Sequence, residues 1–148
     1  MVVWQTTKDL DVKPTLLPLL KDGDLQIRMW TVGLLSQMAD EAPEVFEIVA
    51  PYAVDPDVRM RGMVLSMMPY FGKRGLPILQ RGLLDVDHWR IRWSAMWTVA
   101  RMGKEAEPLL PIMLALQNDP EAEIRKELPE ALFQMDPKRF PKSANPDN

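Results

Sequence analysis

Apolar residues recur every three to four positions along most of the chain, in stretches bounded by prolines, glycines and short acidic turns. Between residues 91 and 102 the apolar row is Ile91, Ala95, Val99 and Met102, and Gly103 follows it. This spacing is typical of one face of an α-helix that ends at a glycine. Similar rows begin at Ile27 and Ile124, so the pattern predicts an all-α protein.

Four short segments that precede these rows resemble one another. They read DGDLQIR, VDPDVR, VDHWRIR and DPEAEIR, and they end at Arg28, Arg59, Arg92 and Arg125, which are 31, 33 and 33 residues apart. Four positions before the arginine stands Asp24, Asp55, His88 or Glu121, and an acidic side chain there can cap the next helix. The repeating unit is therefore a short helix, an acidic turn and a longer helix.

The second repeat follows this pattern least well, because its row after Val58 includes Gly62 and Ser66, and Pro69 ends or kinks its helix. The shorter helices are expected at residues 14–21, 43–54, 76–84 and 105–116. Three of them contain an internal proline that bends the helix: Pro18, Pro51 and Pro111.

These turn-and-helix units resemble the short HEAT repeats of the phycobilisome-lyase type, over about residues 14–136. The resemblance implies a right-handed α-solenoid of four helical hairpins, with repeats at about 14–40, 43–72, 75–103 and 105–136 in a domain spanning 1–136. It also implies that Arg28, Arg59, Arg92 and Arg125 form a ladder with turn carboxylates. Residues 137–148 form a polar, proline-rich tail that we expect to be loosely ordered.

Composition narrows the class of protein further. The chain has 148 residues, 47% of them hydrophobic and 26% charged, and no cysteine, which excludes disulfides and thiolate chemistry. No apolar run approaches the roughly 18 residues of a membrane span, and no signal peptide is recognisable at the N-terminus. We therefore expect a cytoplasmic protein that has no membrane partner.

In HEAT-like repeats the positions one, five and nine residues after the arginine are usually polar. Where this chain has apolar residues at those positions, they mark a candidate surface. The predicted partner-binding surface comprises Trp89, Trp93, Trp97, Met60 and Val64, with a rim of Arg61, Arg90 and Arg101. The rim lies within residues 59–104, which carry 9 basic and 2 acidic side chains. Exposed apolar patches with tryptophan and arginine are typical of interfaces. Burial of the tryptophans in this chain, or in a homodimer, remains an alternative, and Trp4 and Trp30 are interpreted as packing residues.

Catalytic chemistry finds little support in the sequence. The one histidine, His88, occupies a capping place and is interpreted as a capping or solvent-exposed residue. The paired turn carboxylates recur in every repeat, as helix caps do and a single active site does not. No nucleophile elbow, phosphate-binding loop or metal-binding motif is recognisable, so we expect no catalytic residue, metal or cofactor.

The sequence therefore predicts a non-catalytic scaffold or adaptor that binds a protein, with arginines that favour an acidic partner. The alternative is a nucleic-acid-binding HEAT-like module related to alkylated-base DNA glycosylases, in which tryptophans stack on bases and arginines contact phosphates. Against that alternative, the stripe from Trp89 to Trp97 contains no carboxylate of its own.

Overall fold

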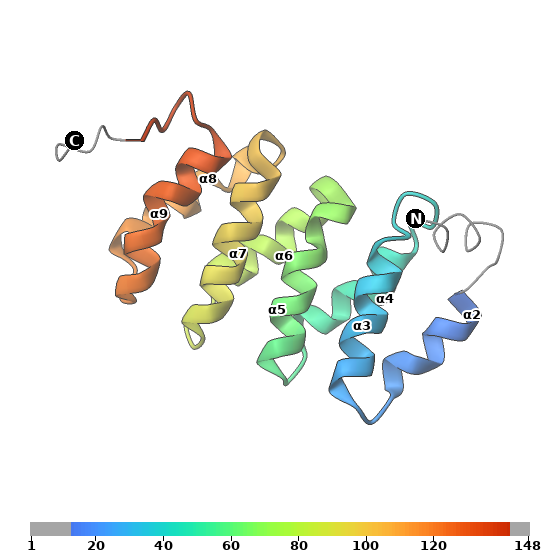
Figure 1. Ribbon diagram of the computed structural model, residues 1–148. Coiled ribbons are helices and arrows are strands. Elements are labelled where there is room, and N and C mark those ends of the chain that lie inside the picture. The colour runs from blue at the N-terminus through green and yellow to red at the C-terminus, as the bar shows by residue number, and fades with distance from the viewer. Residues whose placement is uncertain (1–12, 143–148) are drawn as a thin grey trace.

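The computed structural model describes residues 13–142 of the 148-residue chain (Figure 1). Within these residues every regular element is an α-helix or a 3-10 helix, and no β-strand is present. The predicted all-α class is therefore confirmed.

Four longer helices are the main elements of the fold. They are α3 (Leu25–Ser36), α5 (Val58–Met67), α7 (Trp89–Met102) and α9 (Ala122–Met135). Each contacts the next in chain order, and Figure 1 shows them side by side. We call these four the B helices and the row that they form the B row.

Shorter segments, the A elements, precede each B helix. They are α2 (Lys13–Leu16) with η1 (Leu17–Lys21), α4 (Val45–Val49) with η2 (Ala50–Val54), η3 (Met68–Gly75) with α6 (Leu76–Leu83), and η4 (Gly103–Leu109) with α8 (Leu110–Ala115) and η5 (Leu116–Asn118). Each contacts the B helix that follows it. Pro18 and Pro51 lie where an α-helix changes to a 3-10 helix, since proline cannot donate the helical hydrogen bond.

An arginine at the start of each B helix fixes the register of the repeats. Arg28, Arg61 and Arg92 donate from Nη1 to the carbonyl oxygens of Asp22, Asp55 and Asp85, over 2.7, 2.8 and 2.7 Å. Arg125 makes the same bond to Asp119. The sequence had predicted Arg59 as the arginine of the second repeat, but the structure shows that it is Arg61. The spacings between the four arginines therefore become 33, 31 and 33 residues.

The segment DVRMR contains two arginines, and the Val-Arg pair that resembles the other repeats is the wrong one. Packing decides between them, because the register of Arg61 directs Met60, Val64 and Met68 into the core, where each is 0% exposed. Two glycines that follow α5 and α7 agree with this register. Gly72 and Gly103 lie 31 residues apart, as Arg61 and Arg92 do, and both have a positive φ (53° and 58°) that favours glycine.

The predicted apolar rows of the third and fourth repeats face the core. Ile91, Ala95 and Val99 are buried in α7, and Ile124 with Leu128 is buried in α9. The first row follows the same direction, although its first member, Ile27, is only half-buried. The core therefore runs continuously beneath the B row, as expected of repeats that bury one another.

Six residues of the expected loosely ordered tail, 137–142, lie against the last repeat. Phe140 packs on the core, Arg139 lies 3.6 Å from Glu107, and Lys142 lies 3.1 Å from Glu130. The rest of the tail, 143–148, is outside the described residues.

Candidate partner-binding surface

Helix α7 directs two different rows of side chains to its two sides. The row that contains Ile91 is buried, whereas Trp93 is 37% exposed and Trp89 and Trp97 are half-buried against the edge of the core. The tryptophan stripe is therefore neither fully buried nor fully exposed. Trp93 is the member that solvent reaches most.

Trp93 and Trp97 are joined to the next B helix through one carboxylate. Both indole Nε1–H groups donate to Oε2 of Glu127 on α9, each over 2.7 Å. The two rings meet edge to face, with centroids 6.4 Å apart and an angle of 64°. The indoles are thus held in one orientation by a contact that crosses from the third repeat to the fourth.

Glu127 is ionised under this arrangement. The hydrogen bond from Trp97 is the largest cause that lowers the pKa of Glu127, and the bond from Trp93 adds to it; partial desolvation acts in the opposite direction but does not outweigh them. Among the described residues no basic side chain forms an ion pair with Glu127. The surface around Trp93 therefore carries the negative charge of Glu127, although the stripe from Trp89 to Trp97 contains no acidic residue.

Met60 and Val64 do not belong to this surface. Both are 0% exposed, so their assignment to the partner-binding face is wrong. The error comes from the register of the second repeat: Met60 is equivalent to Ile91 and not to Trp93. The residues equivalent to Trp93 and Trp97 in α5 are Gly62 and Ser66.

The three predicted rim arginines divide into two groups. Arg61 is half-buried and bonded to its own turn through Asp55, so it belongs to the arginine ladder. Arg90 and Arg101 are exposed near opposite ends of α7, and Arg90 lies over the ring of Trp89 at 5.1 Å from its centroid. Arg59, which the sequence had assigned to the ladder, instead forms an exposed ion pair with Asp57 over 2.7 Å.

Trp30 is a surface residue that the sequence interpretation missed. It is 65% exposed on α3, and Leu34, one turn further on, is 46% exposed. Trp30 follows the repeat arginine by two residues, a place that the reasoning about polar positions did not consider. The other tryptophan interpreted as a packing residue, Trp4, lies outside the described residues.

The turn carboxylates have the structural role expected from their recurrence, with the second repeat shifted. Oδ1 of Asp22, Asp55, Asp85 and Asp119 accepts the backbone N–H two residues later. Side-chain caps of the B helices come from Asp24 and Asp57, whereas His88 and Glu121 make no such bond. His88 stands at the N-cap position of α7 and is exposed, so of the two predicted roles it fills the solvent-exposed one, without a side-chain capping bond.

One buried ion pair links two repeats. Nε and Nη2 of Arg92 donate to the two carboxylate oxygens of Asp119 over 2.7 and 2.8 Å, and both residues are buried. Desolvation raises the pKa of Asp119, but the hydrogen bonds from Arg92 and the Glu121 amide outweigh it and lower the pKa overall. Of the four arginines that the structure places in the predicted ladder, only Arg92 has a turn carboxylate as its partner within the described residues. The other three arginines, Arg28, Arg61 and Arg125, bond to carbonyl oxygens of their turns.

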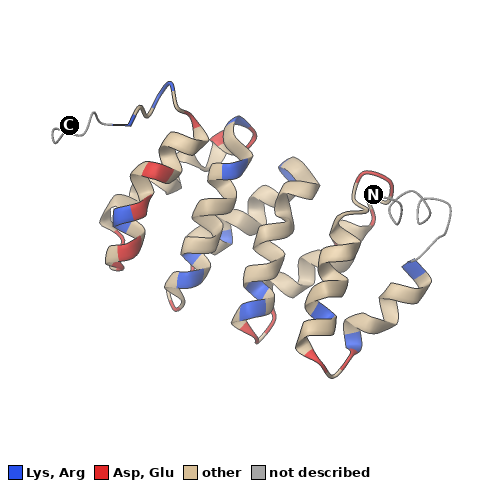
Figure 2. Ribbon diagram, in the orientation of Figure 1, with Lys and Arg blue, Asp and Glu red and all other residues tan. Residues whose placement is uncertain are grey.

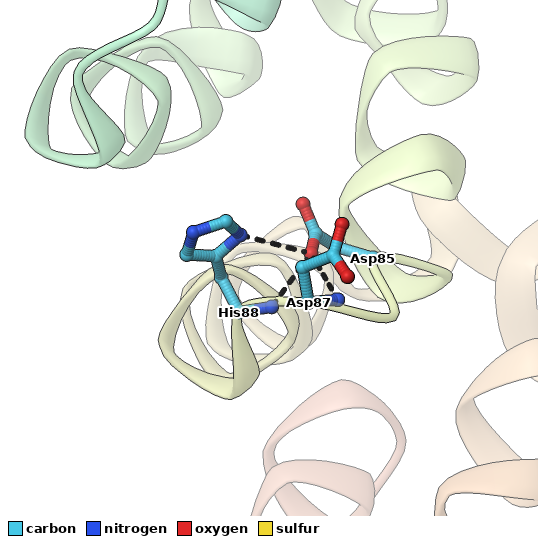
Figure 3. Close-up of side chains that lie close together, drawn as sticks. All are labelled: Asp85, Asp87 and His88. Carbon is cyan, nitrogen blue, oxygen red and sulfur yellow. Dashed lines mark hydrogen bonds and ion pairs between the residues drawn. The ribbon is translucent and has the colours of Figure 1, made fainter.

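His88 lies in a cluster with Asp85 and Asp87 at the turn between α6 and α7 (Figure 3). These side chains offer ligand atoms within 4.8 Å of one another, close enough to hold a cation. However, Oδ1 of Asp85 already accepts the N–H groups of Asp87 and His88, and Nη2 of Arg61 lies 3.2 Å from His88 Nδ1. A guanidinium beside the ring opposes a bound cation, so the arrangement is better explained as a turn.

Comparison with known proteins assigns no family to this chain. No protein-family model matches it, and a search of characterised proteins also gave no match. Within residues 13–142, no helix has both the length and the apolar character needed to span a membrane. The interpretation of function therefore depends on the surface itself.

Proposed function

We propose that the chain is a HEAT-like right-handed α-solenoid that acts as a non-catalytic scaffold or adaptor. It binds a protein partner on the outer surface of α7 and α9, through Trp93 and Trp97 with Arg90 and Arg101 at the rim. The solenoid assignment is supported by four repeats with the same arginine-to-carbonyl bond and by the contacts between successive B helices.

The observation that carries the proposal is the shared hydrogen bonding of the two indoles to Glu127. A tryptophan held in one orientation before binding loses little conformational freedom when a partner arrives, which favours affinity. Tryptophan is also enriched among the residues that contribute most to interfaces. The carboxylate thus prepares Trp93 and Trp97 as anchors.

The charges around the anchors bear on the chemistry of the partner. Figure 2 shows that α9 carries both basic and acidic residues, whereas most of α5 and α3 carries neither. With Glu127 beside the indoles and Arg90 and Arg101 at the two ends of α7, the surface fits an apolar segment flanked by charges of both signs. An acidic partner, which the sequence favoured, would meet Glu127 as well as the two arginines.

A capture experiment tests this proposal. The wild-type chain, the double variant Trp93→Ala/Trp97→Ala and the control Val86→Ala would be immobilised and exposed to lysate from the native source. Val86 is an exposed apolar residue on the turn before α7 and lies outside the proposed site. We expect the wild type and the control to retain the same protein and the double variant to lose it, with unchanged far-UV circular dichroism. Equal retention by all three chains would contradict the proposal.

A second candidate function is recognition of nucleic acid, and Glu127 gives it new support. The sequence argument against a glycosylase-like site was the lack of a carboxylate in the tryptophan stripe, and α9 supplies one by a 2.7 Å contact with each indole. Arg90 and Arg101 are available to contact phosphates.

Binding of a labelled oligonucleotide distinguishes the two functions. A nucleic-acid module binds at about 50 mM salt and weakens steeply as salt rises, since released counterions drive the association. Single-stranded and duplex probes, measured by fluorescence anisotropy, should both be used. The absence of binding at low salt eliminates this candidate. The candidate is supported if the chain binds and if Arg101→Ala weakens the binding while Trp93→Ala abolishes it.

A further inference from the structure

The N-terminal end of the B row presents an apolar stripe on α3. Its apolar residues are Trp30 and Leu34, which are 65% and 46% exposed. They follow the repeat arginine by two and six residues. In the other three repeats these two places are occupied by Met63 and Met67, Ser94 and Thr98, and Glu127 and Ala131.

The equivalent residues of the other repeats face the preceding B helix. A Cβ built on Gly33 of α3 would lie 2.8 Å from the end of Met63, and Glu127 accepts the indole bonds from α7. Thr98 and Ala131 are almost completely buried. Trp30 and Leu34 are therefore in the position where a B helix packs against its predecessor, and among the described residues no B helix precedes α3.

The opposite end of the B row is different in character. There the places one, five and nine residues after the arginine are Lys126, Glu130 and Gln134, and Lys142 forms an ion pair with Glu130. A polar outer surface of this kind ends a stack of repeats. Head-to-tail association of two chains would place Trp30 and Leu34 against these charges, so the geometry disfavours it.

The stripe on α3 is matched instead by another copy of itself. It runs Gln26, Trp30, Leu34 and Gln37, and it contains no charge. The equivalents of Gln26 in the other three repeats are all charged: Arg59, Arg90 and Glu123. If two such stripes pack antiparallel, Trp30 lies against Leu34 and each glutamine lies against a glutamine, without repulsion between like charges.

We infer that this stripe is the interface of a two-fold symmetric homodimer, in which α3 of one copy packs antiparallel on α3 of the other. Each copy supplies α3 of the other with a neighbouring B helix that residues 13–142 of its own chain do not provide. The inference is independent of the proposed function, because the anchors Trp93 and Trp97 are on α7, which is separated from α3 by α5.

Sedimentation of the full-length chain at about 1–100 µM tests the homodimer, a range suited to dissociation constants in the micromolar range. We expect the wild type to dimerise and Trp30→Glu to raise the dissociation constant at least about 30-fold, the effect of losing a residue central to an interface. The control Trp93→Ala should leave the dimer unchanged. Dissociation caused by Trp93→Ala and not by Trp30→Glu would overturn the inference and move the interface to α7.

Crosslinking keeps the test informative if Trp30→Glu fails to fold. The chain has no cysteine, so Leu34→Cys and Val86→Cys each introduce one thiol. A short bis-maleimide should join two chains through Cys at position 34 and not at position 86. A wild type that stays monomeric up to about 100 µM would overturn the inference and leave the stripe to a different protein or to the chain's own residues 1–12.

Discussion

At the scale of single residues, the ion pair between Arg92 and Asp119 is notable because both side chains are buried. It removes two charges from water, and two parallel hydrogen bonds compensate for the lost hydration. The pair also connects the third repeat to the turn of the fourth. Removal of either partner leaves a buried charge without its counterion.

Asp119→Asn should therefore destabilise the fold by about 3–5 kcal/mol at neutral pH, as expected for an uncompensated buried charge. Urea unfolding measures the change. Because the pKa of Asp119 is lowered in the folded chain, its contribution is present above the unfolded pKa and is lost as pH falls through the folded one. The difference between wild type and variant should thus shrink in acid, below the ordinary aspartate value of 3.8.

Asp57→Asn is the matched control, since Asp57 forms an exposed ion pair with Arg59 and asparagine can still cap α5. It should lose far less stability than Asp119→Asn. Equal losses in the two variants would mean that the buried pair has no special role.

Glu127 is the second residue whose chemistry is measurable. Protonation of its carboxylate weakens the bonds from Trp93 and Trp97, so tryptophan fluorescence should titrate with a midpoint below 4.5, the ordinary glutamate value. In Glu127→Gln this transition should disappear while the fold remains. A midpoint at or above 4.5, or an unchanged titration in the variant, would show that the indoles do not depend on this carboxylate.

At the scale of elements, the B helices are specified by their apolar rows and the A elements by their prolines. Rows with helical spacing begin at Ile91 and Ile124, and the structure buries them as predicted. In the second repeat, two candidate rows differ by two residues. The burial of Met60, Val64 and Met68 decides the register of α5.

This register predicts that Met60→Ala destabilises the chain by about 2–5 kcal/mol, because truncation of a buried methionine leaves a cavity. Thermal unfolding provides the measurement. Val58→Ala should have a smaller effect, since Val58 is only half-buried. The order would reverse if α5 adopted the register that begins at Arg59, with Val58 in the core and Met60 on the surface.

At the scale of the whole molecule, the chain is a row of similar units with different ends. Each B helix contacts the next one along the chain, and in the proposed solenoid stability would accumulate through these nearest-neighbour interfaces. The C-terminal end is covered by polar side chains and by residues 137–142, whereas the N-terminal end presents Trp30. This asymmetry is the basis for the inferred dimer.

The covering segment at the C-terminal end gives a further prediction. Phe140→Ala removes a half-buried ring from the last repeat and should cost about 1–2 kcal/mol, less than a fully buried phenylalanine. Hydrogen exchange should quicken in α9 and remain unchanged in α3, because α9 contacts elements of the last two repeats and α3 lies at the other end of the B row. Uniform acceleration along the chain would indicate that it unfolds as a single cooperative unit.

Local patterns in the sequence are enough to predict the helical class and the direction of the Ile91 row, because periodicity and turn residues act over a few positions. They could not choose between Arg59 and Arg61, since both registers look similar locally and only packing against neighbouring helices distinguishes them. Nor could they predict that Glu127 contacts Trp93 and Trp97, which are 34 and 30 residues away along the chain. Long-range contacts of this kind, and the exposure of Trp30 at the end of a row, arise only when the repeats stack.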